Sequence, residues 1–475
     1  MLVDDVLLEI FDLLCRKLHY NLSHWKPRPT WDWLVLAHVC RRWRQIIFDS
    51  PRRLTLRILC TYGTPVRKNL GIWPAFPIDI QLDSPEDLTP KDEDNTIAAL
   101  EHRGRVNTVD LFATGSQLGK MVSMMQEPFP VLSHLRMLSK DQDIPLITTE
   151  FLGGFAPNLQ AITLHLILFP ALPTLLSSTS ELVTLNIFDL HMAGYISPER
   201  MVACLATLPR LEVFALTFLD GALLHPDQIY PPPATRSALP VLISFSFQGA
   251  FEYLEDLVAR IDTPQLERVS IIYLDYPLDS QVMPLSNFIN RAIGPESTPP
   301  RHALVRFQFK RVTFTLSRDY ETSQGWDRRS VTSTISYEVL GWSYVEDLAH
   351  ALSQFSAALC TVVHLELEAE FNESALSDHV YDINWPHLLH QFLAMRTLHV
   401  STELAGSVSR ALEFFKFMAV IVAEIMPSIG LICLEGEPAA SLENLLAILQ
   451  SSDHPITIVG TTDEFNTKIE SYVTI

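Results

Sequence analysis

One hydrophobic pattern recurs along most of the chain: an apolar residue, two others, an apolar residue, one other, and a third apolar residue. The first seven copies follow one another at near-regular steps, and the later ones are separated by longer insertions. Alternation of this kind predicts strands with one buried face, and helix-like stretches such as 197–208 and 251–261 separate them. The copies are Val106/Val109/Leu111, Leu132/Leu135/Met137, Leu159/Ile162/Leu164, Leu182/Leu185/Ile187, Leu211/Phe214/Leu216, Leu242/Phe245/Phe247, Leu266/Val269/Ile271, Leu304/Phe307/Phe309, Val362/Leu365/Leu367, Met395/Leu398/Val400 and Ile429/Ile432/Leu434.

This spacing predicts a repeat architecture. One strand and one helix cannot close a core, whereas stacked copies bury a continuous one. Periods of 20–29 residues are typical of leucine-rich repeats. The sequence therefore predicts an α/β fold in which residues 97–475 form about 11 degenerate repeats, an irregular solenoid with a parallel sheet on its concave face. An unrelated α/β domain with similar strands is the alternative. The region 310–345 fits worst, and its Ser/Thr-rich part at 318–334 indicates an insertion, either a long β-hairpin or a loop.

Residues 1–58 predict a separate helical module. Apolar residues from Val3 to Leu14 fall at three- and four-residue steps, the period of a helix face, and Asp4 and Asp5 favour its first turn. A second helix is expected from about Asp32 to the proline at 51. Two such helices carry more apolar surface than they can bury alone, so we expect a partner. Residues 59–96 predict a connector, with a short strand at Ile78–Ile80 and a polar, acidic loop at 86–95.

Charge is unevenly distributed along the 475 residues, whose net charge is −20. Residues 1–60 contain ten basic and six acidic residues and sum to +4, which leaves −24 for the rest. An acidic body disfavours nucleic-acid binding, whereas the basic start could attract an acidic protein surface. Six cysteines without a CxxC pair, each among apolar residues, predict buried, reduced thiols. With no signal peptide or membrane span expected, we predict a cytoplasmic or nuclear protein and no membrane partner.

Motifs for catalysis are weak. The segment Gly115–Met121 resembles a phosphate loop but has one residue too few between its glycines, and Met121 stands where Ser or Thr is needed. His387 and His390 lack further ligands nearby in sequence. Glu366, Glu368 and Glu370 share one strand face and predict a solvated acidic stripe, or a patch for a basic partner. We therefore predict no catalytic residue, no cofactor and no metal site.

The N-terminal residues also carry a family resemblance. Leu2, Asp5–Leu8, Ile10–Phe11, Leu14, Val39–Arg44 and Ser50–Pro51 resemble the F-box, and residues 1–111 are similar to fungal F-box proteins with degenerate leucine-rich repeats. The chain departs from that family in having Val3 in place of proline, and an insertion at 20–31. The resemblance implies docking on the adaptor subunit of a cullin–RING ubiquitin ligase. The residues expected to supply or support the docking face are Leu2, Val6, Leu7, Ile10, Phe11, Leu14, Val39, Cys40 and Trp43.

The expected function is that of a non-enzymatic substrate-recognition subunit of an SCF-type ligase, whose repeats bind a client protein. Polar and aromatic residues that alternate with the buried ones should line the concave face. The candidate client-binding residues are Phe112, Arg136, His165, Phe188, Gln248, Lys310, Glu366, Glu368 and His399. Two alternatives remain: a scaffolding repeat protein whose N-terminal helices only cap the solenoid, and a hydrolase whose residues converge only in space.

Overall fold

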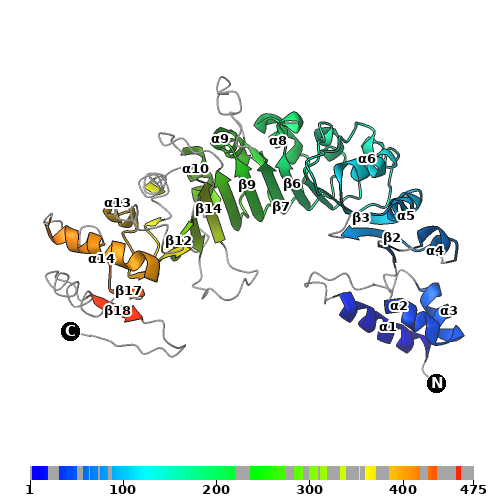
Figure 1. Cartoon of the computed structure of the whole chain (residues 1–475), viewed down its shortest axis with the longest axis horizontal. Coiled ribbons are helices and arrows are strands. Elements are labelled where there is room, and N and C mark those ends of the chain that lie inside the picture. The colour runs from blue at the N-terminus through cyan, green and yellow to red at the C-terminus, as the bar shows by residue number, and fades with distance from the viewer. Residues whose placement is uncertain are drawn as a thin grey trace. The chain divides into compact units, whose positions relative to one another are not determined.

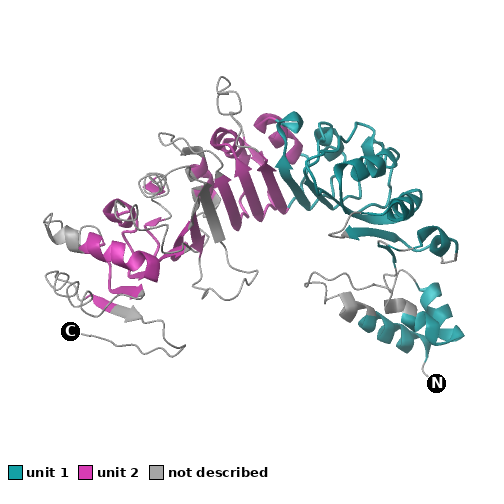
Figure 2. Ribbon diagram, in the orientation of Figure 1, with its two compact units in different colours: residues 1–196, 207–211 teal, residues 197–206, 212–475 magenta. Residues whose placement is uncertain are grey.

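The computed structural model describes most of the chain (Figure 1). The described residues are 3–19, 32–50, 57–61, 63, 65–72, 75–83, 88–219, 236–273, 283–292, 299–308, 311–317, 332–338, 352–353, 359–370, 385–417, 426–435 and 456–461. They fall into two compact units (Figure 2). Unit 1 comprises residues 1–196 and 207–211, and unit 2 comprises residues 197–206 and 212–475. The division into an F-box module, a connector and a repeat domain stays a prediction.

Within residues 3–19 and 32–50, the described part of the N-terminal module, there are three helices where the sequence predicts two: α1 (Asp4–His19), α2 (Asp32–Val39) and α3 (Arg41–Asp49). The expected second helix is interrupted at Cys40, whose backbone is extended (φ −159°, ψ 168°). The Cys40 sulfur accepts a hydrogen bond from the Trp43 backbone N–H at 3.4 Å, which caps α3. Because a side-chain acceptor satisfies an N–H at the helix start, a new helix begins here instead of the old one continuing.

The three helices share a small core. Phe11 is fully buried, and its ring packs edge-on against Trp43 with centroids 4.8 Å apart. Leu7, Ala37 and Ile47 are also buried. Aromatic pairs with this T-shaped geometry contribute about 0.5–1.5 kcal/mol beyond their area burial. The interior of this module is therefore defined by one side of α1 facing α2 and α3.

The rest of unit 1 is a parallel sheet with short helices between its strands. The strands follow chain order: β1 (Ile58–Cys60), β2 (Ile78–Asp83), β3 (Val106–Ala113), β4 (His134–Ser139), β5 (Ala161–His165) and β6 (Thr184–Leu190). The helices are α4 (Val66–Ile72), α5 (Pro90–Leu100), α6 (Gly115–Ser123), α7 (Leu172–Leu176) and the 3-10 turns η1 (Phe151–Gly154) and η2 (Met192–Gly194). In Figure 1 helices α5 and α6 lie on one side of this sheet, so these two helices do not cover its other face.

Two expectations for residues 59–96 have opposite outcomes. The strand at Ile78–Ile80 is confirmed and continues to Asp83, and with β1 it extends the sheet before residue 97. The loop expected at 86–95 is wrong from Pro90 onwards, where α5 begins, and residues 86–87 lie outside the described part of the chain. Thr89 caps this helix: its hydroxyl accepts from the Asp92 N–H, and the Asp92 carboxylate accepts from the Thr89 N–H. The acidic residues therefore stabilise a helix N-terminus.

Unit 2 contains a longer sheet in the order β7-β9-β11-β14-β13-β12-β15-β16-β17-β18. Its strands are β7 (Val213–Phe218), β9 (Ser244–Gly249), β11 (Arg268–Tyr273), β12 (His302–Gln308), β13 (Arg311–Ser317), β14 (Thr332–Glu338), β15 (His364–Glu370), β16 (Thr397–Val400), β17 (Leu431–Glu435) and β18 (Thr457–Thr461). A second, two-stranded sheet pairs β8 (Ser237–Ala238) with β10 (Ile261–Asp262). The helices are α8 (Pro198–Leu205), α9 (Phe251–Ala259), α10 (Met283–Ala292), α13 (Trp385–Leu389) and α14 (Thr402–Phe417).

The irregular region of the sequence is an antiparallel excursion within this sheet. Strand β13 runs antiparallel to both β12 and β14, and β14 then pairs in parallel with β11. Along the chain β12 comes before β13 and β14, whereas in the sheet β14 and β13 lie between β11 and β12. Strands β13 and β14 pair as antiparallel neighbours, but most of the segment 318–334, for which a hairpin or a loop was expected, lies outside the described part of the chain at 318–331. The repeat copy Leu304/Phe307/Phe309 is only partly correct: Phe307 is buried, Leu304 is half-buried between the buried Ala303 and Val305, and Phe309 lies outside the described residues.

The other ten copies of the pattern have all three apolar residues at most 5% exposed. The same turn introduces most of them: the N–H of the first apolar residue donates to the carbonyl three residues earlier. Examples are Leu132 to Phe129 at 3.2 Å, Leu242 to Leu239 at 3.3 Å and Met395 to Phe392 at 3.1 Å. This turn satisfies backbone groups where the chain enters each strand. The α/β fold with leucine-rich-repeat-like strand–helix units around a parallel sheet is therefore confirmed.

Candidate functional site

The first candidate surface is an apolar stripe along α1, here called the outer stripe. Its residues are spaced by three and four positions and lie on one side of the helix. They remain exposed: Val3 68%, Val6 41%, Ile10 38%, Leu13 65% and Leu14 41%. On α2, Val35 and Val39 are 67% and 56% exposed. Single exposed apolar residues are ordinary, but a run of them along one helix face marks an interaction site.

The predicted docking residues divide between this stripe and the core beneath it. Val6, Ile10, Leu14, Val39 and Cys40 are exposed. Leu7 and Phe11 are 4% and 0% exposed, so they support the stripe from inside rather than touch a partner. Trp43 is half-buried against Phe11, and Leu2 lies outside the described residues.

The sequence list missed three exposed members of this surface, Val3, Leu13 and Val35. Helical periodicity alone shows that α1 is apolar on two sides, but it does not show which side faces α2 and α3. At helical spacing, Val3, Val6, Ile10, Leu13 and Leu14 fall on one side of α1 with no polar residue among them. That pattern was the signal in the sequence from which the exposed side could have been found.

Charged residues adjoin the outer stripe. Arg42 pairs with Asp4 at 2.5 Å, which ties α3 to the first turn of α1. Arg41 and Arg44 are exposed on α3, and the Arg44 guanidinium donates to the Ala37 carbonyl at 3.0 Å. An exposed ion pair contributes only about 0–1 kcal/mol. The Arg42–Asp4 pair therefore contributes little to holding the helices together.

The second candidate surface is the face of the unit 1 sheet on which Asp110 and Arg136 lie. Strand register aligns its side chains in rows across the sheet. One row is polar and consists of Gln81, Asp110, Arg136, Thr163 and Asn186. The next row towards the carboxyl ends, here called the aromatic row, contains Phe112, Leu138, His165 and Phe188. All described members of both rows are half-buried, as expected for an uncovered sheet face.

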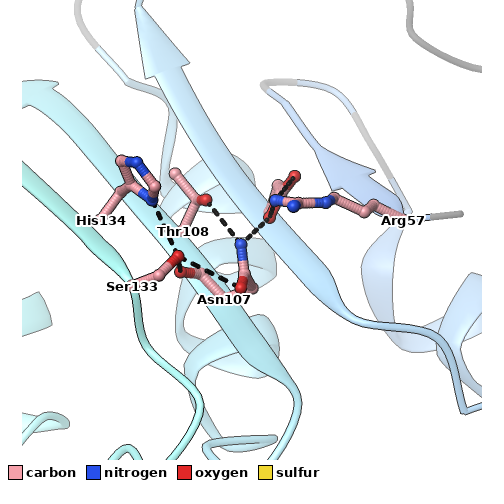
Figure 3. Close-up of polar contacts among 6 residues, drawn as sticks. Arg57, Asn107, Thr108, Ser133 and His134 are labelled. Carbon is pink, nitrogen blue, oxygen red and sulfur yellow. Dashed lines mark hydrogen bonds and ion pairs between the residues drawn. The ribbon is translucent and has the colours of Figure 1, made fainter. Parts of the chain in front are cut away.

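At the amino ends of the same strands a polar network crosses four segments (Figure 3). Arg57 pairs with Asp79 at 3.2 Å, and the Asn107 amide donates to Asp79 at 3.4 Å and to Thr108 at 3.1 Å. The pairing of β2 with β3 shifts by one residue at this point, so Asn107 is the extra residue of a β-bulge. Its side-chain amide bonds Asp79 on β2 and Thr108, the next residue of β3.

The network ends at a serine–histidine pair. The Ser133 hydroxyl lies 2.8 Å from Nδ1 of His134 and 3.1 Å from the Asn107 carbonyl. Burial, and then the positive charge of Arg57, lower the pKa of His134 against the opposing effect of Asp79. A serine beside a neutral imidazole is the start of a nucleophilic site, which also needs a group that orients the imidazole. Asp79 instead bonds Arg57 and Asn107, so this network fits a structural role better than the hydrolase alternative.

On unit 2 the predicted acidic stripe is neutralised by the chain itself, so the expectation of a solvated stripe is wrong for its two described members. Glu366 lies 3.3 Å from His302 and 3.5 Å from His399, contacts from two neighbouring strands. Hydrogen bonds from these two imidazoles lower the pKa of Glu366 to about 2 despite its burial. Glu368 pairs with Arg306 at 2.7 Å. Glu370 pairs through its backbone with Gln308 on β12, and its side chain lies outside the described part of the structure.

The remaining predicted client residues are spread out. Gln248 is half-buried on β9, and Lys310 lies outside the described residues. Glu366, Glu368 and His399 come together on adjacent strands of unit 2, whereas Phe112, Arg136, His165 and Phe188 come together on unit 1. The single set that the sequence predicted is thus divided between the two units, and its members do not form one group in the described residues.

The cysteines only partly match the expectation of buried thiols. Burial raises the pKa of the Cys60 thiol to about 12, with Asp79 adding to the shift. Cys40 and Cys360 are exposed, so the expectation is wrong for them. Among the described residues no three His, Cys, Asp or Glu side chains form a group able to hold a metal ion. The same part of the chain contains no helix whose length and apolar content would let it cross a membrane.

Comparisons with known proteins give little further information. No protein-family model matches the sequence, and no curated protein matches it. Among solved structures, the chain is similar to one in the crystal structure of the Rad7 and Elc1 complex in yeast, with 10% sequence identity and a TM-score of 0.28. That match covers 91% of this chain and 88% of the other. Similarity at these values is too low to indicate a shared function.

Proposed function

We propose that this chain is a non-enzymatic substrate-recognition subunit of an SCF-type cullin–RING ubiquitin ligase. The outer stripe of α1, with Val35 and Val39 of α2, docks on the adaptor subunit, and the repeat sheets bind a client protein. The observation that carries the proposal is the exposure of the stripe. Five large apolar side chains of one short helix stay 38–68% exposed, while Leu7 and Phe11 beside them are buried. A partner that covers the stripe removes this surface from water.

The chemistry of such a subunit is proximity rather than catalysis. A client held on the repeats has its lysines near the ubiquitin-loaded enzyme of the complex, which raises their effective concentration. The residue types on the sheet faces agree with this role, because polar, aromatic and paired charged side chains suit protein recognition.

A scaffolding protein with a helical cap is the second candidate, and one contact favours it. Phe48 of α3 packs against Phe76, which precedes β2 and is 2% exposed, with ring centroids 5.7 Å apart. The C-terminal part of α3 thus covers residues at the start of the sheet, as a cap does. A cap alone does not require the outer stripe, because the stripe lies on α1 and its residues stay exposed.

Co-purification with the adaptor subunit tests the proposal. Val6→Asp with Ile10→Asp places two charges in the stripe without touching the core. Removing two apolar contacts of about 1.5 kcal/mol each should weaken adaptor binding about 100-fold. The matched control is Val131→Asp, since Val131 is also 41% exposed and lies in unit 1 but outside the helices. Wild-type protein that fails to bind the adaptor, or a double variant that binds as wild type, contradicts the proposal.

A further inference from the structure

A serine or threonine followed directly by proline occurs seven times along the chain. In four of these motifs arginine is the third residue after the hydroxyl residue. Lysine and arginine together make up only 35 of the 475 residues, so fewer than one basic residue is expected by chance at the seven positions. The four motifs with arginine begin at Ser50, Thr64, Ser197 and Thr298, and the other three begin at Ser84, Thr89 and Thr263. Ser50 and Thr64 lie in the stretch that resembles F-box proteins, so the arginines that need another explanation follow Ser197 and Thr298.

The motif at Ser197 is the one of the four whose residues all lie in the described part of the chain. Ser197 has extended backbone (φ −61°, ψ 151°) immediately before α8, and its hydroxyl accepts a hydrogen bond from the Arg200 N–H at 3.3 Å. Ser197 is half-buried and Pro198 is buried, whereas Glu199 and Arg200 are exposed. A hydrogen bond from the first turn of α8 thus holds a hydroxyl group beside an exposed arginine.

Helix α5 begins in the same way and shows which residues stabilise such a helix start. Thr89 precedes Pro90, and its hydroxyl accepts from the N–H of the third helical residue at 3.3 Å, as that of Ser197 does. In α5 this third residue is Asp92, whose carboxylate accepts a hydrogen bond from the Thr89 N–H at 3.2 Å. An acidic residue is favoured there because a helix N-terminus is positive. Helix α8 has arginine at this position, a cation that helix stability disfavours.

The surroundings of Arg200 do not explain it either. In the described part of the chain its guanidinium forms no ion pair, unlike that of Arg210, which pairs with Glu181. Burial raises the pKa of the Cys204 thiol, one turn further along α8, against the opposing charge of Arg200. Because that thiol is neutral, it does not balance the cation. Arg200 therefore remains available to a partner.

A protein kinase recognises this combination of residues. Proline directly after the acceptor holds the preceding backbone extended, as that of Ser197 is, and lacks an N–H that would need a partner in the kinase cleft. A cation at the third position pairs with acidic groups of the kinase, and charge patterns of this kind set kinase specificity. The acceptor, the proline and the arginine of such a substrate are all present at 197–200.

We propose that Ser197 is phosphorylated by a proline-directed kinase that recognises Arg200. The Ser197 oxygen forms a bond to the γ-phosphorus of ATP, the bond from that phosphorus to the bridging oxygen breaks, ADP leaves, and the hydroxyl proton passes to a base of the kinase. The first turn of α8 must open to admit the kinase, and helix ends fray. The phosphate then lies at the positive end of α8 and pairs with Arg200, which reverses the unfavourable placement of that cation. This inference goes beyond the proposed function and does not depend on adaptor docking.

Mass spectrometry of the full chain after incubation with ATP and a cyclin-dependent kinase tests the inference. Such a kinase requires proline after the acceptor and favours a cation at the third position. We expect phosphate on Ser197. Arg200→Ala removes one charge-assisted contact with the kinase and should slow modification of Ser197 about tenfold, whereas Arg200→Lys keeps the charge and should react within about threefold of the wild-type rate. Both variants change an exposed side chain, and Tm measurements verify that they remain folded.

Thr89 is the matched control within the same molecule. It is exposed, precedes proline and caps α5 as Ser197 caps α8, but Asp92 stands in the place of the arginine. Thr89 should therefore stay unmodified while Ser197 reacts. Mapping of single sites keeps phosphate on Ser50, Thr64 or Thr298 out of this comparison. No phosphate on Ser197 in the wild type, an unchanged rate in Arg200→Ala, or modification of Thr89 as fast as that of Ser197 overturns the inference.

Discussion

At the scale of single residues, α1 carries two apolar faces that differ in what covers them. Phe11 is enclosed by its own module, whereas Leu13, two positions later, is 65% exposed. Phe11→Ala should therefore lower the stability of unit 1 by about 3–5 kcal/mol, the cost of deleting a buried phenyl ring. Leu13→Ala should be nearly neutral. Hydrogen exchange of the α1–α3 amides measures both, and equal protection in the two variants would contradict the assignment of inner and outer faces.

Glu255 on α9 gives a pH-dependent prediction. Burial raises the pKa of its carboxyl group from 4.5 to about 8, although the Leu285 N–H at the start of α10 donates to it at 3.2 Å. Since the folded pKa is raised, the folded state binds the proton more tightly. Its stabilising contribution is complete below about pH 4.5 and is lost as the pH rises through about 8.

Glu255→Gln keeps an acceptor for Leu285 and does not titrate. We expect the wild type to lose Tm relative to this variant between pH 5 and 9, by roughly 4 °C or more. Glu252→Gln is the control, because Glu252 lies on the same helix and is exposed. Parallel Tm curves for wild type and Glu255→Gln across that range would show that the carboxyl group is ionised in both states.

The sequence patterns predicted which side chains are buried better than they predicted which side chains contact one another. The three apolar positions of most repeat copies are buried because strand alternation fixes which side faces the helices. Glu366 and Glu368, in contrast, looked like free acids. Their partners His302, Arg306 and His399 lie on other strands, far away in the chain, and only strand register brings them together. No local signal in the sequence contains that pairing.

At the scale of elements, α5 shows how a cap decides between loop and helix. Thr89 and Asp92 form a reciprocal capping box that holds two backbone N–H groups. Thr89→Ala removes one acceptor and should destabilise unit 1 by about 1 kcal/mol, whereas Thr89→Ser retains the hydroxyl and should behave as wild type. Urea denaturation compares the three. A loss equal in both variants would mean that the threonine methyl group, not the cap, is responsible.

Two of the features that the sequence failed to predict share a cause. The acidic run before α5 and the helix break at Cys40 are both decided by side-chain bonds to the backbone at helix ends. Hydrophobic periodicity does not register such bonds. The hairpin of β13 and β14 is a different case, since the sequence signalled an insertion but the parallel partner of β14 is a distant strand, β11.

At the scale of the whole molecule, the docking and cap interpretations differ in what can be removed. If α1 and α2 serve docking, deletion of residues 1–39 should leave the repeat sheets folded, with less than about 1 kcal/mol lost from their unfolding transition. Deletion of residues 1–49 also removes Phe48 from Phe76 and should cost more. Scanning calorimetry of both truncations separates the roles. A shorter deletion that unfolds the sheets would favour a cap over a docking module.

The central claim is that the outer stripe is half of an interface with a ligase adaptor. Isothermal titration of purified adaptor subunit into the full chain tests it most directly. The account predicts one-to-one binding with a negative heat-capacity change, the mark of apolar surface leaving water. It also predicts loss of that heat in Val6→Asp/Ile10→Asp and its retention in Val131→Asp. Absence of binding by the wild type, or binding unchanged by charges within the stripe, would contradict it.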